Sequence, residues 1–326
     1  MKPGVLLVNL GTPEAPTARA VRRYLAEFLA DPRVVDLPHW LWLPVLHGVV
    51  LRVRPRRVAA LYRAIWTPEG APLRALTGRL AARLGETLAA RAGGTVPVAV
   101  AMRYGRPALA EGLDALAAQG AGRVVVLPLY PQPAGSTTGS AWDGLCAALR
   151  RRPAPPHLAF VAGYHDHPAY IDALAASVRS HWAAHGRGER LLVSFHGLPL
   201  SQVRAGDAYP ERCARTAALL AASLGLGGGE WALAYQSRFG PARWLEPATD
   251  RLLAEWARAG VRTVDVICPG FAVDCLETLE EIAVQAARAF RAAGGEALRY
   301  VPALNDAPAH AGALAAILAP FLGIPE

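Results

Sequence analysis

His196 and the acidic segment Asp274–Glu281 carry the side chains best suited to acid–base or metal chemistry. His196 directly follows the apolar run Leu191–Phe195 and precedes Gly197-Leu-Pro199. An imidazole with an ordinary pKa of about 6.5 can accept a proton or bind a metal ion near neutral pH. A histidine at the end of a strand is also commonly structural, so both interpretations stay open.

The acidic segment contains a pair of glutamates with helical spacing. Glu277 and Glu281 lie four residues apart and would share one face of a helix. A carboxylate pair of this kind can move protons or bind a hard or borderline cation. Asp274 and Glu280 fit an ordinary helix start equally well, because Asp274 stands three residues before Glu277 and acids in a first turn complement the helix dipole.

Two other segments have polar patterns with weaker implications. Ser136–Ser140 supplies hydroxyl and N–H groups that could hold a carboxylate or phosphate, but it lacks the Gly-Lys-Ser/Thr ending of a P-loop. His181 and His185 have the spacing of metal ligands on a helix, and we expect them on the surface. No strand–GxGxxG–helix unit indicates a dinucleotide site.

The elements that must position these residues alternate along the chain. Short β-branched runs predict eight strands, at Val5–Leu10, Val96–Met102, Val124–Leu129, Leu158–Ala162, Leu191–Phe195, Trp231–Tyr235, Val264–Cys268 and Leu298–Val301. Helical patterns lie between them, such as Thr17–Ala30, which Asp31-Pro32 should end. The alternation predicts an α/β fold with parallel sheets, whose ligands bind beyond the carboxyl ends of the strands.

The two halves of the sequence resemble each other. Leu6–Pro13 can be laid on Leu191–Pro199, and Phe160–Pro168 matches Tyr300–Pro308 without a gap. Arg103-Tyr-Gly105 falls opposite Arg238-Phe-Gly240. Three matches in the same order predict two similar doubly wound lobes. We expect the N-terminal lobe over residues 1–155 and the C-terminal lobe over 156–326, with the last helix packing back on the first lobe.

Composition excludes several classes of protein. The chain has 326 residues, 53% of them hydrophobic, which excludes a disordered or fibrous protein. Four scattered cysteines do not form a disulfide framework. The net charge of +8 is carried almost entirely by arginine and comes without a nucleic-acid motif, so we expect no nucleic-acid partner. No leader pattern is apparent at the start, and we expect a cytoplasmic protein.

The most apolar stretch is Leu37–Leu51, followed by the basic run Arg52–Arg57. It is too short for a spanning helix and is interrupted by Pro38 and Pro44. The sequence leaves open whether residues 37–53 form an exposed apolar lip or an ordinary buried segment.

Read together, these motifs resemble those of the ferrochelatases, which insert ferrous iron into a porphyrin. The resemblance covers nearly the whole chain. It rests on Leu6–Glu14, Ser194–Pro199, Asp207–Pro210, Tyr235–Gly240 with Trp244-Leu245, and above all the long motif Cys268–Glu281. It implies two Rossmann-like lobes with an active-site cleft between them, and protoporphyrin IX as the substrate, with coproporphyrin as the alternative.

The resemblance also implies roles for single residues. His196 and Glu277 would be catalytic, on opposite faces of the porphyrin, and His196, Glu277, Glu281 and Asp274 would contact the metal. The porphyrin pocket would be lined by Leu10, Arg103, Tyr104, Tyr130, Ser136, Trp244 and Phe271. Whether His196 accepts protons or ligates iron stays open. The segment 37–57 would touch a membrane surface from the cytoplasmic side, as in some relatives.

Some features depart from the family pattern. Pro133-Ala134-Gly135 replaces an aromatic residue and a serine, which puts contacts at that wall of the pocket in doubt. The cysteine-bearing C-terminal extension of cluster-containing relatives is not seen, so we expect no [2Fe–2S] cluster and no cofactor beyond the Fe²⁺ substrate. A monomer and a homodimer both stay open. The alternatives are another tetrapyrrole metal chelatase and, outside the enzymes, a haem or metal carrier.

Overall fold

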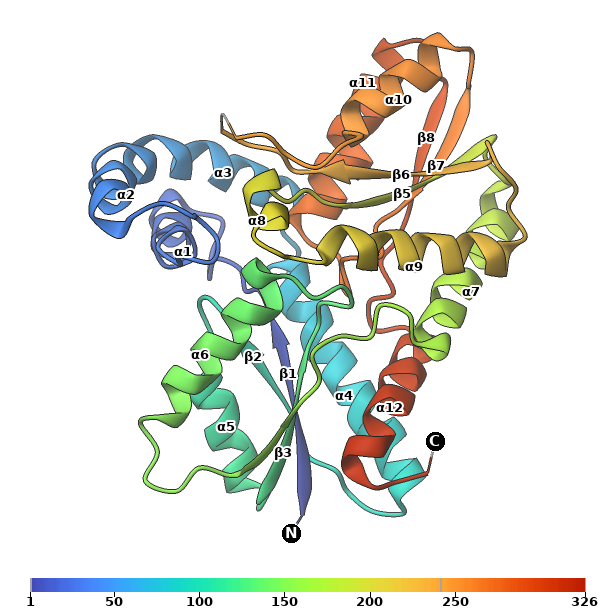
Figure 1. Ribbon diagram of the computed structural model, residues 1–326. Helices are drawn as coiled ribbons and strands as arrows, with labels where there is room; N and C mark the ends of the chain where they lie inside the picture. The colour runs from blue at the N-terminus through green and yellow to red at the C-terminus, as the bar shows by residue number, and fades with distance from the viewer. Residues whose placement is uncertain (1, 241, 326) are drawn as a thin grey trace. The chain divides into compact units, whose positions relative to one another are not determined.

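A computed structural model of the chain describes residues 2–240 and 242–325 and divides it into two compact units. Unit 1 comprises residues 1–130, 134–163 and 314–326, and unit 2 comprises residues 131–133 and 164–313. Each unit contains one parallel four-stranded sheet (Figure 1). The predicted α/β class and the two Rossmann-like lobes are therefore confirmed. The cleft between the lobes stays a prediction.

Unit 1 is built on the strand order β2-β1-β3-β4. Its strands are β1 (Pro3–Asn9), β2 (Val98–Met102), β3 (Arg123–Pro128) and β4 (His157–Phe160). Its helices are α1 (Ala18–Leu29), α2 (His39–Val45), the π-helix η1 (Leu46–Val50), α3 (Leu51–Ile65), α4 (Pro72–Ala92), α5 (Leu109–Ala118), the π-helix η2 (Gly135–Gly139) and α6 (Ser140–Leu149). Figure 1 shows α5 and α6 on one side of this sheet and α4 on the other.

Unit 2 has the strand order β6-β5-β7-β8. Its strands are β5 (Arg190–His196), β6 (Trp231–Gln236), β7 (Thr263–Ile267) and β8 (Ala297–Val301). Its helices are α7 (Pro168–His185), α8 (Leu200–Arg204), α9 (Tyr209–Leu224), α10 (Thr249–Arg258), the π-helix η3 (Glu277–Ala286) and α11 (Ala287–Ala292). The last helix, α12 (Pro308–Leu322), contributes residues to both units.

The elements form where the sequence patterns predict them. All eight predicted strands are present, and the central strands β1 and β5 are apolar runs that are buried on both faces of their parallel sheets. Helix α1 begins where the Thr17 hydroxyl accepts a hydrogen bond from the Ala20 N–H, and it buries Val21 and Leu25. In unit 2, one face of the sheet packs with α10 and α11 around Trp256 and Phe290.

The strand registers define the internal repeat residue by residue. Val5 pairs with Val98 and Val125 in unit 1, and Leu191 pairs with Trp231 and Asp265 in unit 2. Arg123 pairs with His157 and Thr263 pairs with Ala297, so the crossover after the third strand has the same length in both units. This register confirms the match of Phe160 with Tyr300.

The other two matches read from the sequence were out of register. The strand pairing places Leu10 opposite His196 and Gly11 opposite Gly197 with no gap, one residue from the alignment of Leu6 with Leu191. It places Arg103 and Tyr104 opposite Gln236 and Ser237, two residues from the Arg238-Phe-Gly240 match. A seven-residue longer loop in unit 2 explains the second slip, because the Met102 and Tyr235 amides donate to the carbonyls of Pro107 and Pro247.

The segment 37–53 is an exposed apolar surface, which we call the lip. Its helices α2, η1 and α3 leave large side chains in solvent, with Trp40 75% and Val53 72% exposed. Leu46 and Leu51 are buried beneath them, and the Trp42 indole N–H donates to the Leu29 carbonyl at 2.7 Å, which attaches α2 to α1. The alternative of an ordinary buried segment was therefore wrong. No helix in residues 2–240 and 242–325 is long and apolar enough to cross a membrane.

Candidate active site

His196 is the last residue of β5, and one nitrogen of its ring is hydrogen-bonded to the following backbone. Its Nδ1 lies 2.7 Å from the carbonyl oxygen of Gly197. A carbonyl can only accept, so Nδ1 carries a proton, and in the neutral imidazole Nε2 is then the acceptor. The Tyr209 hydroxyl donates to the His196 carbonyl at 3.1 Å and fixes the backbone below the ring. The half-buried imidazole is therefore oriented as a base or a ligand at Nε2.

Glu281 is held by a single residue at the end of the neighbouring strand β6. The Ser237 amide donates to Glu281 Oε1 at 2.6 Å, and the Ser237 hydroxyl donates to Oε2. Burial raises the pKa of Glu281 above its ordinary value, while the Ser237 hydroxyl and the nearby His196 ring oppose that shift. Glu277 acts on Glu281 in the opposite direction to His196, as a like charge. His196, Glu277 and Glu281 therefore belong to one electrostatic group.

Glu277 starts the π-helix η3, whose turn is wider than that of an α-helix. The Gln236 amide donates to the Glu277 carbonyl at 3.0 Å, while its own oxygen accepts from the Ser194 hydroxyl at 2.8 Å. Gln236 is paired with His196 in the β5–β6 ladder, so it joins the histidine strand to the glutamate helix. The predicted shared face of Glu277 and Glu281 is thus attached to the sheet through Gln236 and Ser237.

Asp274 is engaged in internal hydrogen bonds rather than open to a metal. It is 6% exposed. Its Oδ1 accepts from the hydroxyls of Thr278 at 2.9 Å and Tyr300 at 2.6 Å, and its Oδ2 accepts from the Asn305 amide at 2.7 Å. The Thr278 hydroxyl in turn accepts from the Cys275 N–H, so threonine and not Glu277 completes the helix start. The structure therefore gives Asp274 a supporting position, and iron binding there would require these bonds to break.

The described residues contain no preformed metal cluster. Within residues 2–240 and 242–325, no group of three or more histidine, cysteine, aspartate or glutamate side chains is arranged to hold a metal ion. Contact of His196, Glu277, Glu281 and Asp274 with iron therefore stays a prediction. Of the two histidines expected on the surface, His185 is exposed, whereas the His181 side chain is largely buried, with its Nε2 3.7 Å from Asp265 Oδ1.

In unit 1, Arg103 and Tyr104 belong to a buried network around Asp31. Asp31 Oδ2 accepts from the Arg103 guanidinium at 2.6 Å, the Tyr104 hydroxyl at 2.8 Å and the Ser140 hydroxyl at 2.6 Å. Arg103 Nε also donates to the Ser140 carbonyl and hydroxyl. Tyr104 is 1% exposed, and its hydroxyl is occupied by this network. Its predicted contact with a porphyrin stays a prediction.

The remaining unit 1 residues of the predicted pocket lie at the same end of the sheet. Leu10 follows β1 and packs with Tyr130 on the core. Tyr130 is buried, and no hydrogen-bond partner of its hydroxyl is found among the described residues. Ser136 is half-buried in η2. The departure Pro133-Ala134 is accommodated without a polar side chain, and the Arg212 guanidinium donates to the Pro133 carbonyl at 2.6 Å.

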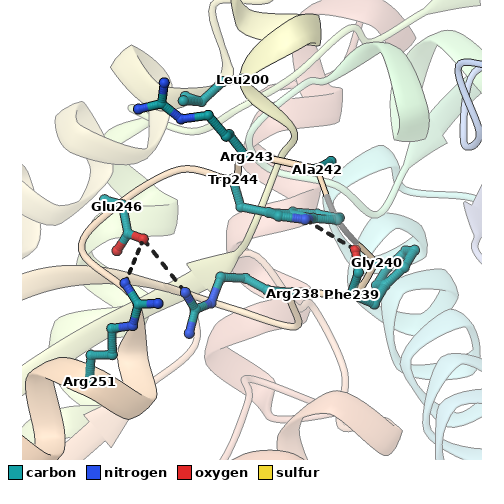
Figure 2. A pocket seen from close by; sticks show the side chains of 9 residues that line it. All are labelled: Leu200, Arg238, Phe239, Gly240, Ala242, Arg243, Trp244, Glu246 and Arg251. Carbon is teal, nitrogen blue, oxygen red and sulfur yellow. Dashed lines mark hydrogen bonds and ion pairs between the residues drawn. The ribbon is translucent and has the colours of Figure 1, made fainter.

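Trp244 lines a cavity of ≈ 510 Å³ in unit 2 (Figure 2). Its indole N–H donates to the Phe239 carbonyl at 3.1 Å, and a Cβ added at Gly197 would lie 3.2 Å from its ring. Glu246 lies between the guanidinium groups of Arg238 and Arg251 at 3.5 and 3.4 Å. Phe271 is half-buried and packs against the core of unit 2. The cavity therefore combines an aromatic wall with a positively charged rim beside the His196 strand end.

Asp31 was not predicted from the sequence as a site residue, because it reads as the end of a helix. Ser140, Gln236 and Ser237 had a weaker signal. Ser140 belongs to the hydroxyl-rich segment Ser136–Ser140, and Gln236 and Ser237 follow the predicted strand Trp231–Tyr235 at the end of the sheet where ligands were expected.

Comparison with known proteins gives a consistent family. A ferrochelatase family model matches residues 2–320. The chain is 53% identical to the ferrochelatase of Nitrosococcus oceani over 95% of this chain and 84% of that one. It is 52% identical to ferrochelatase 1 of Shewanella oneidensis, with 94% and 92% covered, and 50% identical to the ferrochelatase of Vibrio cholerae, with 97% of each covered.

Solved structures agree on the fold. The chain is similar to SirB from Bacillus subtilis with Fe³⁺, with a TM-score of 0.55 at 14% identity over 97% of this chain and 94% of that one. It is similar to the sirohydrochlorin chelatase SirB of Bacillus subtilis subspecies spizizenii in complex with cobalt, with a TM-score of 0.54 at 13% identity over 96% and 92%. At this identity the likeness concerns the fold alone. With the sequence relatives, it leads to one assignment: the chain belongs to the ferrochelatase family, the porphyrin metal chelatases that insert iron into a porphyrin in haem synthesis.

Proposed function

We propose that this ferrochelatase inserts Fe²⁺ into protoporphyrin IX, with His196 as the acceptor of the pyrrole protons. The observation that carries the proposal is the orientation of His196, whose Nδ1 donates to the Gly197 carbonyl, so that in the neutral ring Nε2 is the nitrogen that can accept a proton. Glu277 and Glu281, on η3, pass protons or iron. The non-enzymatic alternative, a haem or metal carrier, has no use for an oriented base beside a carboxylate pair.

The residue types suit the two tasks of metallation. Two pyrrole N–H protons must leave the macrocycle while a cation enters it. A neutral imidazole can take a proton near pH 7, and carboxylates can escort a cation or a proton. The buried thiols of Cys268 and Cys275 are poor alternatives as ligands, because burial raises their pKa well above the ordinary value and keeps them protonated.

The test is anaerobic metal insertion followed by the change in porphyrin absorbance. Ferrous iron is offered with protoporphyrin IX and with coproporphyrin III in parallel. Faster turnover of protoporphyrin IX supports the proposed substrate, and faster turnover of coproporphyrin III contradicts it. Binding of both porphyrins without turnover, under conditions in which a control ferrochelatase is active, would contradict the enzymatic proposal and favour a carrier.

We also propose that the lip contacts an anionic membrane surface from the cytoplasmic side. Trp40, Val49 and Val53 form an exposed apolar face, and the basic run that begins at Arg52 follows it on the same helical segment. Apolar side chains beside arginines suit the interface between lipid tails and anionic headgroups. Membrane contact here is peripheral and reversible.

Vesicle sedimentation tests the membrane proposal. The chain should bind vesicles that contain anionic lipid and release them in high salt, and Trp40→Ser together with Val53→Ser should weaken binding about tenfold. Trp142→Ser, which changes an exposed tryptophan on α6, is the matched control. The membrane proposal would be contradicted if the Trp40→Ser/Val53→Ser variant bound anionic vesicles as well as Trp142→Ser does. It would also be contradicted if the unchanged chain bound neutral and anionic vesicles equally.

A further inference from the structure

Among residues 2–240 and 242–325, two non-glycine residues have a left-handed backbone. They are Ser237, with φ of 62°, and Asn305, with φ of 50°. This region costs an L-residue free energy, and residues held in it against that cost cluster at functional sites. Ser237 follows β6 and Asn305 lies between β8 and α12, so nothing in their chain positions alone connects them.

Both residues grip the same acidic segment. Ser237 makes two bonds to one carboxylate, from its amide and its hydroxyl to the two oxygens of Glu281. The left-handed backbone is what turns both donors toward one side. Glu281 can therefore neither rotate nor retract without breaking both bonds.

Asn305 makes two hydrogen bonds to Asp274, at the other end of the acidic segment Asp274–Glu281. Its Oδ1 accepts from the Asp274 amide at 2.8 Å, and its Nδ2 donates to Asp274 Oδ2 at 2.7 Å. Its carbonyl accepts from Nδ1 of His310 at 2.6 Å, which fixes the turn that bears it. Asp274 in turn accepts a hydrogen bond from the hydroxyl of Thr278, which follows Glu277 on η3.

The positions equivalent to Ser237 and Asn305 by the internal repeat have no left-handed backbone. By the strand register, Ser237 corresponds to Tyr104 in unit 1 and Asn305 corresponds to His165, and neither of these has a positive φ. The residues that Ser237 and Asn305 hold, Glu281 and Asp274, correspond to Ala141 and Ala134. The two halves of the repeat thus differ in both the carboxyl groups and the residues that restrain them, which indicates that the restraint accompanies the carboxylates.

We propose that Ser237 and Asn305 are positioning residues that fix the glutamates of η3 for metal insertion. The inference rests on the proposed function and adds the reason for the two strained positions. A π-helix with carboxylates on one face would otherwise let them spread apart. Ser237 fixes Glu281 directly, and Asn305 fixes the start of η3, and with it Glu277, through Asp274.

Glycine variants separate the side-chain contacts from the backbone strain. Ser237→Gly and Asn305→Gly keep a left-handed backbone without penalty and remove the side-chain bonds. Ser237→Ala keeps the strain and removes only the hydroxyl. Ser201→Ala, at an exposed serine of α8, is the control. For each variant we would measure thermal unfolding, hydrogen exchange over residues 274–286, and kcat and KM for ferrous iron and for porphyrin separately.

The glycine variants should lower kcat/KM for iron about tenfold, change KM for porphyrin less than twofold, and lose exchange protection in η3. Folded variants with unchanged iron kinetics would overturn the proposal. An equal loss for both substrates together with a lower melting temperature would also overturn it, because that is the mark of general destabilisation. A wild-type chain without any turnover would sink the proposed function instead, and the exchange data would still show whether the two residues hold η3.

Discussion

At the strand end where unit 2 carries His196, unit 1 carries Leu10, and Thr137 and Ala141 stand in the positions of Glu277 and Glu281. The strand order and the register are the same, and a π-helix begins the crossover helix in both units. One scaffold therefore supports two kinds of strand end. Unit 2 leaves titratable groups partly accessible, whereas unit 1 ties its charges into the buried pair of Asp31 and Arg103.

The largest difference between the units should be seen on replacing the equivalent strand-end residues. His196→Ala removes the proposed proton acceptor and should lower kcat by at least about a hundredfold, because a positioned general base contributes roughly 10²–10⁴ in rate. Leu10→Ala removes only apolar surface and should change kcat less than tenfold. Porphyrin binding, followed by absorbance, should survive in both variants.

This pair of variants can break the comparison. If Leu10→Ala were as damaging to kcat as His196→Ala, the strand end of unit 1 would take part in the chemistry as strongly as that of unit 2. Turnover retained in His196→Ala would remove the proposed role of the histidine altogether.

The second prediction concerns the stability of the charge pairs in the two units. Asp31→Ala leaves Arg103, Tyr104 and Ser140 without their shared acceptor and should lower the free energy of unfolding by about 3 kcal/mol. Asp250→Ala removes the exposed partner of Arg238 in unit 2, and the change should stay below about 1 kcal/mol. Urea denaturation at pH 7.5 measures both.

The Asp31 network also has a pH dependence with a definite sign. Burial alone would raise the pKa of Asp31, but hydrogen bonds from Ser140, the Arg33 amide and Tyr104 outweigh it and lower that pKa below the ordinary value. The stabilisation is therefore present above the pKa of the unfolded state and is lost as the pH falls through the folded value. An unfolding free energy of Asp31→Ala that ran parallel to the wild type below pH 5 would contradict this origin.

The third prediction uses Gly11 and Gly197, which occupy the same position after β1 and β5. A Cβ at Gly11 would lie 1.8 Å from the Tyr104 carbonyl oxygen, at a φ of 108°, whereas a Cβ at Gly197 would lie 2.8 Å from the Gln236 carbonyl oxygen. Gly11→Ala should thus cost about 3 kcal/mol or more, and Gly197→Ala about 1–2 kcal/mol. Equal losses in urea denaturation would show that the two strand ends are equally tight.

The sequence predicted the scaffold more fully than the restraints on it. The eight strands could be predicted because short apolar runs rich in β-branched residues, bounded by turn signals, favour buried strands. His196 and Glu277 were accessible through their residue types and motif. The π-helix was not, because Glu277 and Glu281 have the same spacing in either helix. The two hydrogen bonds from Ser237 to Glu281 depend on a left-handed backbone at Ser237, and a serine in the sequence does not predict that conformation.

The internal repeat is visible in the sequence, but its register is not. Arg103-Tyr-Gly105 and Arg238-Phe-Gly240 are similar triplets, yet they are two residues out of register in the structure. Hydrogen-bonded strand pairs removed that ambiguity. The correction matters for function, because it replaces a supposed pair of equivalent arginines by the pair Tyr104 and Ser237, two residues that hold carboxylates in different ways.

The smallest predicted effect separates His310 from Tyr170, its counterpart in the first half of the sequence repeat. His310 is 0% exposed, and burial lowers its pKa to about 4 from the ordinary 6.5. The folded chain therefore keeps this ring neutral while the unfolded chain takes up a proton below pH 6.5, so stability falls with decreasing pH until about pH 4. Between pH 7.5 and 5.5 the loss from this group should be about 1.4 kcal/mol. His310→Gln should remove that part of the pH dependence in urea denaturation.

Tyr170→Phe is the matched control, because Tyr170 is equally buried but does not titrate in this range. Its hydroxyl donates to the Pro269 carbonyl, so its removal should lower stability by about 1 kcal/mol at every pH. A parallel curve for Tyr170→Phe and a flatter one for His310→Gln would assign the slope to the buried imidazole. If the free energy of unfolding had the same pH dependence in the wild type, Tyr170→Phe and His310→Gln, His310 would not be the source of that dependence. The His310 imidazole would then become exposed before the protein unfolds, which means that the turn bearing Asn305 opens locally.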